Sequence, residues 1–234
     1  MNGIAPTLAT LLFAILPYVA LFTFLLVTIQ RYRSRAFTYS SLSSQFLENR
    51  QHFWALVPFH YGIIILLFGH LIGLLIPRAV LLWNSHPLRL YVLEVTALAF
   101  GVLTLVGLLS LVVRRLQAHK VRVTTSAADW IVYVLLLVQV AAGIAVAVLY
   151  PWGTSWYAAA AAPYLQSVFL LQPDTSYVAA MPWLAQLHIV NAFVIITLFP
   201  FTRLVHILVI PNPYLWRKPQ VVRWYGRGQA ETGK

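Results

Sequence analysis

Long apolar stretches recur along this chain and are separated by shorter polar segments. Five of them are long enough to cross a hydrocarbon layer of about 30 Å as helices, which takes roughly 20 residues each. Lipid offers the backbone no hydrogen bonds, so a spanning segment must pair its amides internally, and these runs are too long for barrel strands. The pattern predicts an all-α protein, an integral membrane bundle of five transmembrane helices near residues 7–30, 54–77, 90–113, 127–150 and 184–210, with a basic tail at 211–234.

Composition agrees with a membrane protein. The 234 residues are 61% apolar and 9% charged, with a mean hydropathy of +0.80, whereas about a quarter of the residues of soluble domains are charged. The first apolar run is long and has no preceding Lys or Arg, so we expect a retained span and not a cleaved signal peptide. The chain has no cysteine, which excludes structural disulfides, thiolate-bound iron–sulfur clusters and thioether-attached haem.

The formal net charge of +11 is unevenly placed. Apart from Arg78 and Arg89, the Lys and Arg residues lie between the first and second spans, between the third and fourth spans, or at the C-terminal end. Positive residues favour the cytoplasmic side, so this bias predicts the N-terminus outside and the C-terminus in the cytoplasm, in the cell membrane. We interpret the basic surface as a topology signal, and we expect membrane lipid and no nucleic acid as a partner.

The tail from residue 211 is basic and aromatic. On the predicted topology it lies in the cytoplasm, where it would dock a partner protein or contact anionic lipid headgroups.

Four of the seven histidines lie within the apolar spans. Because the second and fifth spans run in opposite directions, His60 and His206 should both lie toward the cytoplasm, and His70 and His188 toward the outside. Each level then holds one imidazole from each helix, as two stacked bis-histidine haems need. His188 and His206 are eighteen residues apart, which puts them on one helix face about 27 Å apart along the axis. His60 and His70 are only about 15 Å apart along theirs. Because the paired histidines must lie at the same levels, we expect helix tilt or a bend at Pro200 to absorb the difference.

Other interpretations of these histidines stay open. A neutral imidazole in a bundle can simply hydrogen-bond to a neighbouring helix. In a haem-free transporter or membrane anchor, histidines could instead relay protons or line a polar path. The pairing at two levels and the near absence of acidic residues from the spans favour haem over a transporter.

Several residues near the histidines could support a cofactor. Gly69 and Gly73 leave a flat strip beside His70, which would admit a haem or a closely packed helix. Arg203 and Arg115, near the cytoplasmic ends of their spans, could bind haem propionates or anchor the helix ends.

Three further features lie near span ends. Arg89 is close to the outer level and could hydrogen-bond a quinone oxygen or anchor a helix. Ser126 and Asp129 have capping-box spacing, so we expect Asp129 to cap the fourth span. The stretch 163–171 is expected to form a short interfacial helix.

Four segments carry a family resemblance: "FHYGIIILLFGHLIG", "RRLQAHKVRVTTSAAD", "LHIV" and "FPFTRLVHILVIPNPYLWRKPQVVR". They resemble the gamma subunit of respiratory nitrate reductase, a di-haem membrane cytochrome b, and the likeness covers nearly the whole chain. The resemblance implies that His60 and His206 bind the cytoplasmic-side haem, and that His70 and His188 bind the outer one. It also implies that Gly69, His70 and Arg89 contribute to a pocket for menaquinol or ubiquinol, although the family has lysine at the position of Arg89.

This resemblance implies a quinol-oxidising electron-transfer subunit of a quinone-dependent oxidoreductase. Quinol would be oxidised near the outer face, and electrons would pass through two b-type haems to an iron–sulfur beta subunit and a molybdenum alpha subunit on the cytoplasmic side. The same di-haem architecture would also fit a nitrite-oxidising or a sulfur-metabolism complex, because the terminal substrate is handled by the partner.

Overall fold

The computed structural model describes residues 6–34 and 50–209, which form helices and no strands. The tail 211–234 and its expected partner contact lie outside the described residues. In chain order the elements are α1 (Pro6–Thr10), the π-helical turn η1 (Leu11–Ile15), α2 (Leu16–Ser34), α3 (Arg50–Leu75), α4 (Pro77–Asn84), α5 (Pro87–Gln117), α6 (His119–Val123), α7 (Ala127–Leu149), α8 (Gly153–Trp156), the π-helical turn η3 (Tyr157–Ala161), α9 (Ala162–Phe169), α10 (Ser176–Ala179), α11 (Trp183–Leu198), the 3-10 turns η4 (Phe199–Phe201) and η5 (Arg203–Val205), and α12 (His206–Val209).

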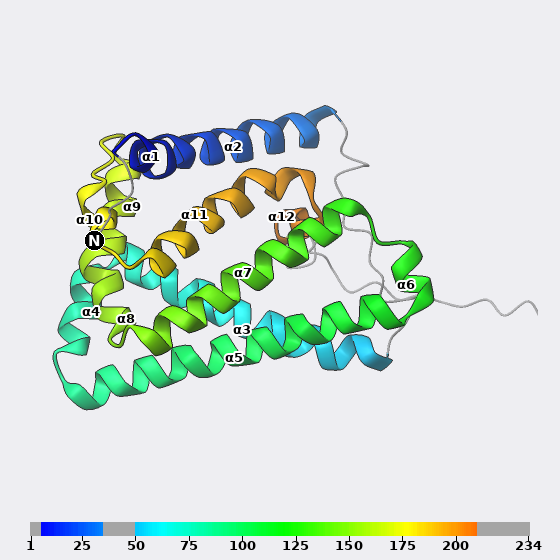
Figure 1. Cartoon of the computed structure of the whole chain (residues 1–234), viewed down its shortest axis with the longest axis horizontal. Helices are drawn as coiled ribbons and strands as arrows, with labels where there is room; N and C mark the ends of the chain where they lie inside the picture. The colour runs from blue at the N-terminus through cyan, green and yellow to red at the C-terminus, as the bar shows by residue number, and fades with distance from the viewer. Residues whose placement is uncertain (1–5, 35–49, 210–234) are drawn as a thin grey trace, which may run out of the picture.

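Five helical segments are long and apolar enough to cross a membrane: Thr7–Ser34, Phe53–Leu75, Pro87–Gln117, Ala127–Leu149 and Trp183–Phe201. The predicted all-α bundle of five membrane-length helices is therefore confirmed. Figure 1 shows α4, α8, α9 and α10 gathered at one end of the long helices, which we call the cap end, and α6 at the opposite end, which we call the α6 end. Large apolar side chains such as Leu26, Leu67 and Ile131 are exposed on the bundle's sides, which suits a lipid environment.

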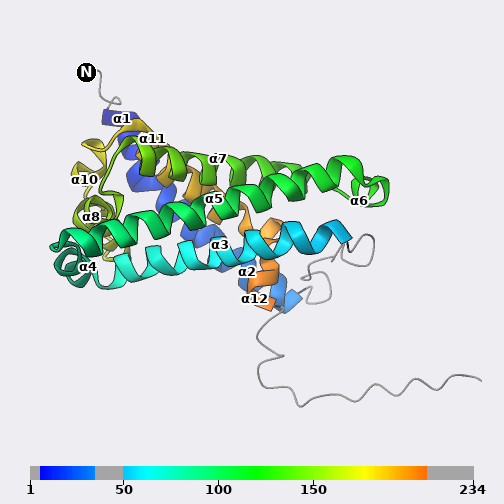
Figure 2. The ribbon, with the colours of Figure 1, turned by 90° about the horizontal axis from the view of Figure 1, so that it is seen from below.

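The long helices pack in a continuous series, in which α5 also packs against α7. α3 packs along α5, and α11 packs against α7 and α2 (Figures 1 and 2). Two glycines allow the close approach of α3 and α5: a Cβ on Gly62 would lie 2.9 Å from the backbone nitrogen of Thr104, and a Cβ on Gly107 would lie 2.8 Å from the Cα of Phe59. Within the described residues, α3 does not pack closely against α11, although these two helices carry His70 and His188.

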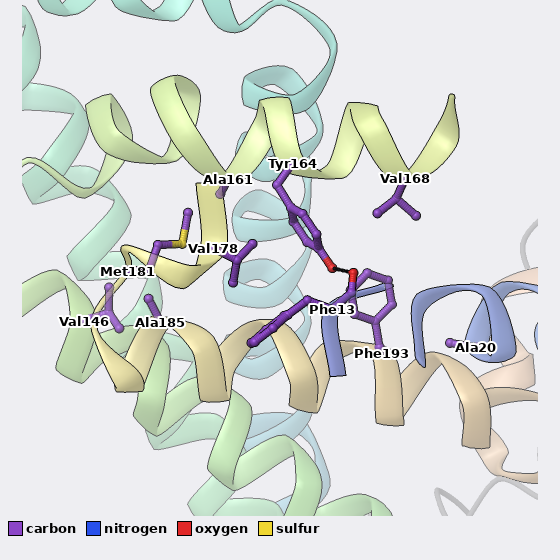
Figure 3. Close-up of a cluster of buried hydrophobic side chains, with 10 residues drawn as sticks. All are labelled: Phe13, Ala20, Val146, Ala161, Tyr164, Val168, Val178, Met181, Ala185 and Phe193. Carbon is purple, nitrogen blue, oxygen red and sulfur yellow. Dashed lines mark hydrogen bonds between the residues drawn. The ribbon is translucent and has the colours of Figure 1, made fainter. Parts of the chain in front are cut away.

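The cap end contains a buried hydrophobic cluster. Figure 3 shows Tyr164 of α9 pointing toward the π-helical turn of the first span, where its hydroxyl donates to the carbonyl of Phe13 at 2.8 Å. Burial, with a contribution from Tyr18, raises the pKa of Tyr164 above its usual range, so the phenol keeps the proton that it donates. The helix α9 confirms the short helix expected at 163–171, and it ties the segment between α7 and α11 to the first span.

The fifth span is interrupted at Pro200, where tilt or a bend was expected. α11 ends at Leu198, a 3-10 turn follows at Phe199–Phe201, and Thr202 is extended with φ −121° and ψ 176° before the chain turns again. Pro200 contributes to the break, because proline lacks a backbone donor and cannot continue the hydrogen bonds of α11, although the preceding Phe199 keeps helical dihedrals. The expected bend at Pro200 is therefore confirmed, but the expectation that His188 and His206 share one helix face was wrong, since they lie on α11 and α12.

Candidate functional site

Four histidines meet in two pairs. The ring centres of His60 and His206 lie 6.1 Å apart, and those of His70 and His188 lie 6.2 Å apart. α3 contributes one ring to each pair, with His70 toward the cap end and His60 nearer the opposite end. The structure thus brings together the same partners that opposite helix directions predicted.

In all four rings, Nδ1 lies within hydrogen-bonding distance of a backbone carbonyl. A carbonyl can only accept, so Nδ1 carries a proton at this contact. In a ring with one proton, Nε2 is then the nitrogen that can bind a metal. The distances are 2.9 Å for His60 to Leu56, 2.8 Å for His70 to Leu66, 3.0 Å for His188 to Gln139 and 2.7 Å for His206 to Arg203.

The spacing of the pairs fits a bis-imidazole metal centre. Two imidazoles that bind one metal ion from opposite sides hold their ring centres roughly 6 Å apart, since each metal–nitrogen bond is about 2 Å long and each ring centre lies about 1 Å behind its nitrogen. Among the described residues, no group of three or more His, Cys, Asp or Glu could hold a bare metal ion. Haem iron needs only axial ligands from the protein, so the residues present fit one haem at each level.

The space around His70 is only partly filled by protein. A Cβ on Gly69 would meet no atom within 4 Å, whereas one on Gly73 would lie 2.7 Å from the ring of Tyr157. The Tyr157 hydroxyl donates to the carbonyl of His70 at 3.0 Å, and its ring lies edge-on to the imidazole. Burial raises the pKa of Tyr157 to about 12, which keeps it a neutral donor. The glycine strip is therefore closed by Tyr157 at Gly73 and open at Gly69.

His188 is oriented by α7. Besides the bond from its Nδ1 to the carbonyl of Gln139, its Nε2 lies 3.1 Å from the side-chain amide of Gln139. Asn191, one turn further along α11, donates to the side-chain oxygen of Gln139 at 2.8 Å and to the carbonyl of Leu135 at 2.9 Å. A metal at Nε2 would replace the Gln139 amide, while the contact that fixes Nδ1 would remain.

A buried charge cluster lies toward the α6 end. Asp129 and Ser126 form the expected capping box, which confirms Asp129 as the cap of α7. The carboxylate of Asp129 also lies 2.9 Å from Nε of Arg203 and 3.8 Å from the guanidinium of Arg115. Arg115 additionally donates to the hydroxyls of Tyr133 and Thr125, both at 2.8 Å.

Comparison with known proteins identifies the family. The family model described as nitrate reductase gamma subunit matches residues 9–225. The chain belongs to this family. The nitrate reductase gamma chain of Bacillus subtilis (strain 168) is 32% identical over 216 residues, which cover 91% of this chain and 97% of that protein. Respiratory nitrate reductase 2 gamma chain of Escherichia coli (strain K12) is 34% identical over 216 residues, covering 89% and 94%.

A further match extends over part of a longer protein. The nitrate reductase-like protein NarX of Mycobacterium tuberculosis (strain ATCC 25618 / H37Rv) is 32% identical over 215 residues, which cover 88% of this chain and 32% of that protein. As a gamma subunit with five membrane-length helices, the chain is a multi-pass membrane subunit of an oxidoreductase complex that has other subunits.

The side chain of Arg89 in this gamma subunit contacts Trp83 and not His70. It lies in the first turn of α5 at the cap end, exposed, with its guanidinium carbon 5.1 Å from the ring centre of Trp83. Glu94, one turn further along α5, accepts from the backbone and hydroxyl of Thr154 at 2.8 and 2.7 Å. Glu94 therefore joins α5 to α8 at the cap end.

Three residues of this site were not predicted from the sequence. Gln139 and Asn191 are polar positions within apolar spans, and Asn191 follows His188 by three residues, so helical spacing could have indicated them. Tyr157 gives no such signal, because only the folding of the segment after α7 brings it to His70.

Proposed function

We propose that this gamma subunit is the membrane cytochrome b of a respiratory nitrate reductase, with one b-type haem held by His60 and His206 and another by His70 and His188. The supporting observation is the two ring pairs, separated by 6.1 and 6.2 Å, with every Nδ1 directed at a carbonyl. Haem supplies one-electron transfer when bound at such sites. The chain directs Nδ1 of each imidazole at a carbonyl, which would leave Nε2 for the iron.

Of the two arginines considered for haem propionates, Arg203 is the better candidate. The side chain of Arg115 is only 8% exposed and its guanidinium already contacts Tyr133, Thr125 and Asp129. The side chain of Arg203 is 27% exposed and belongs to the same turn as His206. A guanidinium has five donors, so Arg203 can bind Asp129 and a propionate together.

We propose that quinol, menaquinol or ubiquinol, is oxidised at the cap end beside His70. The open space at Gly69 gives room for a planar ring, and His70 is exposed there. Tyr157 contributes a neutral hydroxyl, and Arg89 contributes a cation at the same end of the bundle that could hydrogen-bond a quinone oxygen.

The charge distribution supports an orientation for this reaction. Basic residues concentrate toward the α6 end, as in Arg114, Arg115, Lys120 and Arg122, so we assign this end to the cytoplasm and the cap end to the outside of the cell membrane. Protons from quinol would then leave outside. Electrons would pass inward to an iron–sulfur beta subunit, which would deliver them to a molybdenum alpha subunit that reduces nitrate.

A reduced-minus-oxidised spectrum of the purified complex tests the haem proposal. We expect two b-type signals in the wild type, loss of one in His188→Ala and loss of the other in His206→Ala. His119→Ala, at an exposed position in α6, is the matched control and should retain both. The absence of any b-type signal from the wild-type complex would disprove the proposal. Equal loss of both signals in His188→Ala would contradict the pairing.

A further inference from the structure

His206 is separated from α11 by the break at Thr202. After this break the chain forms the 3-10 turn η5, and His206 begins α12. The hydrogen bonds of α11 therefore do not continue to His206 and do not set its orientation. The contacts that hold η5 against other elements bear directly on the direction of the His206 ring.

Arg203 makes these contacts with the start of α7. Its Nε lies 2.9 Å from Oδ1 of Asp129, and its Nη2 donates to the carbonyl of Thr124 at 3.0 Å. Two donors on one planar guanidinium fix both position and angle, which a single contact does not. The η5 turn is thereby attached to the loop and cap that begin α7.

The opposite oxygen of Asp129 is fixed as well. Oδ2 accepts from the backbone nitrogen of Ser126 at 2.9 Å, and the side chain of Asp129 is only 6% exposed. The guanidinium of Arg115 lies 3.8 Å away and adds a second positive charge. A buried carboxylate held in this way is a rigid anchor, and loss of one of its partners would leave a charge without compensation.

The anchor connects directly to the imidazole. The carbonyl of Arg203 accepts from Nδ1 of His206 at 2.7 Å. The same residue thus binds Asp129 through its side chain and orients His206 through its backbone. A second restraint comes from α2, where Arg31 donates to the carbonyl of Pro200 at the break itself.

We propose that Asp129 is a positioning residue for His206. The carboxylate holds Arg203, and the carbonyl of Arg203 accepts from Nδ1 of the imidazole, whose ring centre lies 6.1 Å from that of His60. This inference rests on the proposed function, because the imidazole's task is to bind haem. It gives Asp129 a role beyond capping α7, at a distance from any reacting atom.

The experiment compares Asp129→Asn with Ser126→Ala in the full-length chain within its membrane complex. Asn has nearly the same shape and can still accept from the backbone of Ser126, but it removes the charge that binds Arg203. Ser126→Ala removes the other half of the capping box, in which the Ser126 hydroxyl accepts from the nitrogen of Asp129 at 3.2 Å, and it leaves the carboxylate in place. Low-spin and high-spin haem signals are measured by electron paramagnetic resonance and assigned with His188→Ala and His206→Ala.

We expect Asp129→Asn to convert part of the α6-end haem signal from low-spin to high-spin, with the cap-end signal unchanged. Ser126→Ala should leave both signals as in the wild type. Arg203→Lys, which keeps the charge but offers no fork of donors, should show a smaller conversion. In the double variant Asp129→Asn/Arg203→Lys, the loss should be smaller than the sum of the two single losses, because both changes break the connection between Asp129 and Arg203.

Three results would overturn the positioning role: an unchanged α6-end signal in Asp129→Asn and Arg203→Lys, an equal loss of both haem signals in these two variants, or the same change in Ser126→Ala. Failure of the proposed function looks different. In that case the wild-type complex itself contains no b-type haem, before any variant is compared.

Discussion

At the scale of single residues, the four imidazoles are oriented in two different ways. The Nδ1 atoms of His60, His70 and His206 bond to carbonyls three or four residues earlier in their own segment, at Leu56, Leu66 and Arg203. For His60 and His70, helix geometry places such a carbonyl close by without help from other elements, whereas the carbonyl for His206 belongs to the turn η5, which Arg203 attaches to the start of α7. His188 instead bonds to Gln139 on α7. Its orientation therefore depends on how α11 is seated against another helix.

Tyr157→Phe tests the role of the cap tyrosine beside His70. The change removes one hydrogen bond, worth about 0.5–1.5 kcal/mol, and keeps the ring that fills the space at Gly73. We expect a shift in the midpoint potential of the cap-end haem and a higher KM for quinol, with the α6-end haem unchanged. Because burial raises the pKa of Tyr157 to about 12, the phenol keeps its proton, so the difference from wild type should be constant between about pH 6 and 9.

Tyr164→Phe provides the control for this prediction. Its hydroxyl bond to Phe13 is similar in length, at 2.8 Å, but lies within the hydrophobic cluster of the cap and contacts none of the four histidines. The variant should lower the stability by a similar amount and leave both haem potentials unchanged. If the two variants shifted the cap-end potential equally, Tyr157 would have no specific role at His70.

At the scale of elements, the hydrophobic pattern predicted the helices well and their interruptions poorly. Length and polarity are summed over some twenty residues, so one proline hardly changes them. The mismatch of the histidine heights indicated a bend at Pro200, but nothing predicted the end of α11 at Leu198 or the extended Thr202. The actual break follows from local backbone chemistry at Pro200 and from a carbonyl that accepts a bond from Arg31 on another helix. Such a partner cannot be read from the segment itself.

Asn191→Leu tests how α11 is held against α7. Asn191 donates to Gln139 and Leu135 from a position that is 6% exposed. Interhelical hydrogen bonds in membranes contribute about 0.6–2 kcal/mol, and we expect a loss of stability in this range, measured by unfolding in mild detergent. Thr197→Val is the control, because its hydroxyl bonds within its own helix to Phe193. Equal losses in the two variants would contradict an anchoring role for Asn191.

Gly107→Ala tests the close packing of α3 and α5. The added methyl group would lie 2.8 Å from the Cα of Phe59, so the two backbones must separate, at a cost of about 1–3 kcal/mol in unfolding free energy. Gly69→Ala is the matched change on α3, where the methyl group meets no atom within 4 Å. It should leave the stability unchanged or slightly raise it, because alanine favours helix by about 1 kcal/mol. Similar losses at both positions would show that the contact with Phe59 is not decisive.

At the scale of the whole molecule, the pairing of the histidines could be predicted from the sequence, but the contacts that hold the histidine-bearing segments in place could not. Opposite directions of the second and fifth spans were enough to pair His70 with His188, because helix direction alone sets the level of each residue. The cap contact of Tyr157 joins segments 87 residues apart, and the bond from Arg203 to the carbonyl of Thr124 joins segments 79 apart. No periodicity within one segment encodes such contacts, so they follow only from the folded chain.

The orientation of the bundle can be tested directly because the natural chain has no cysteine. Ala180→Cys, beside α10 at the cap end, and Ala127→Cys, at the start of α7 near the α6 end, each place one thiol at an exposed position. If basic residues stay in the cytoplasm, a membrane-impermeant maleimide should label Ala180→Cys in intact cells and Ala127→Cys only after permeabilisation. The reverse pattern would place His60 and His206 on the outside. Quinol oxidised beside His70 would then release its protons into the cytoplasm, and the reaction would no longer contribute to the membrane potential.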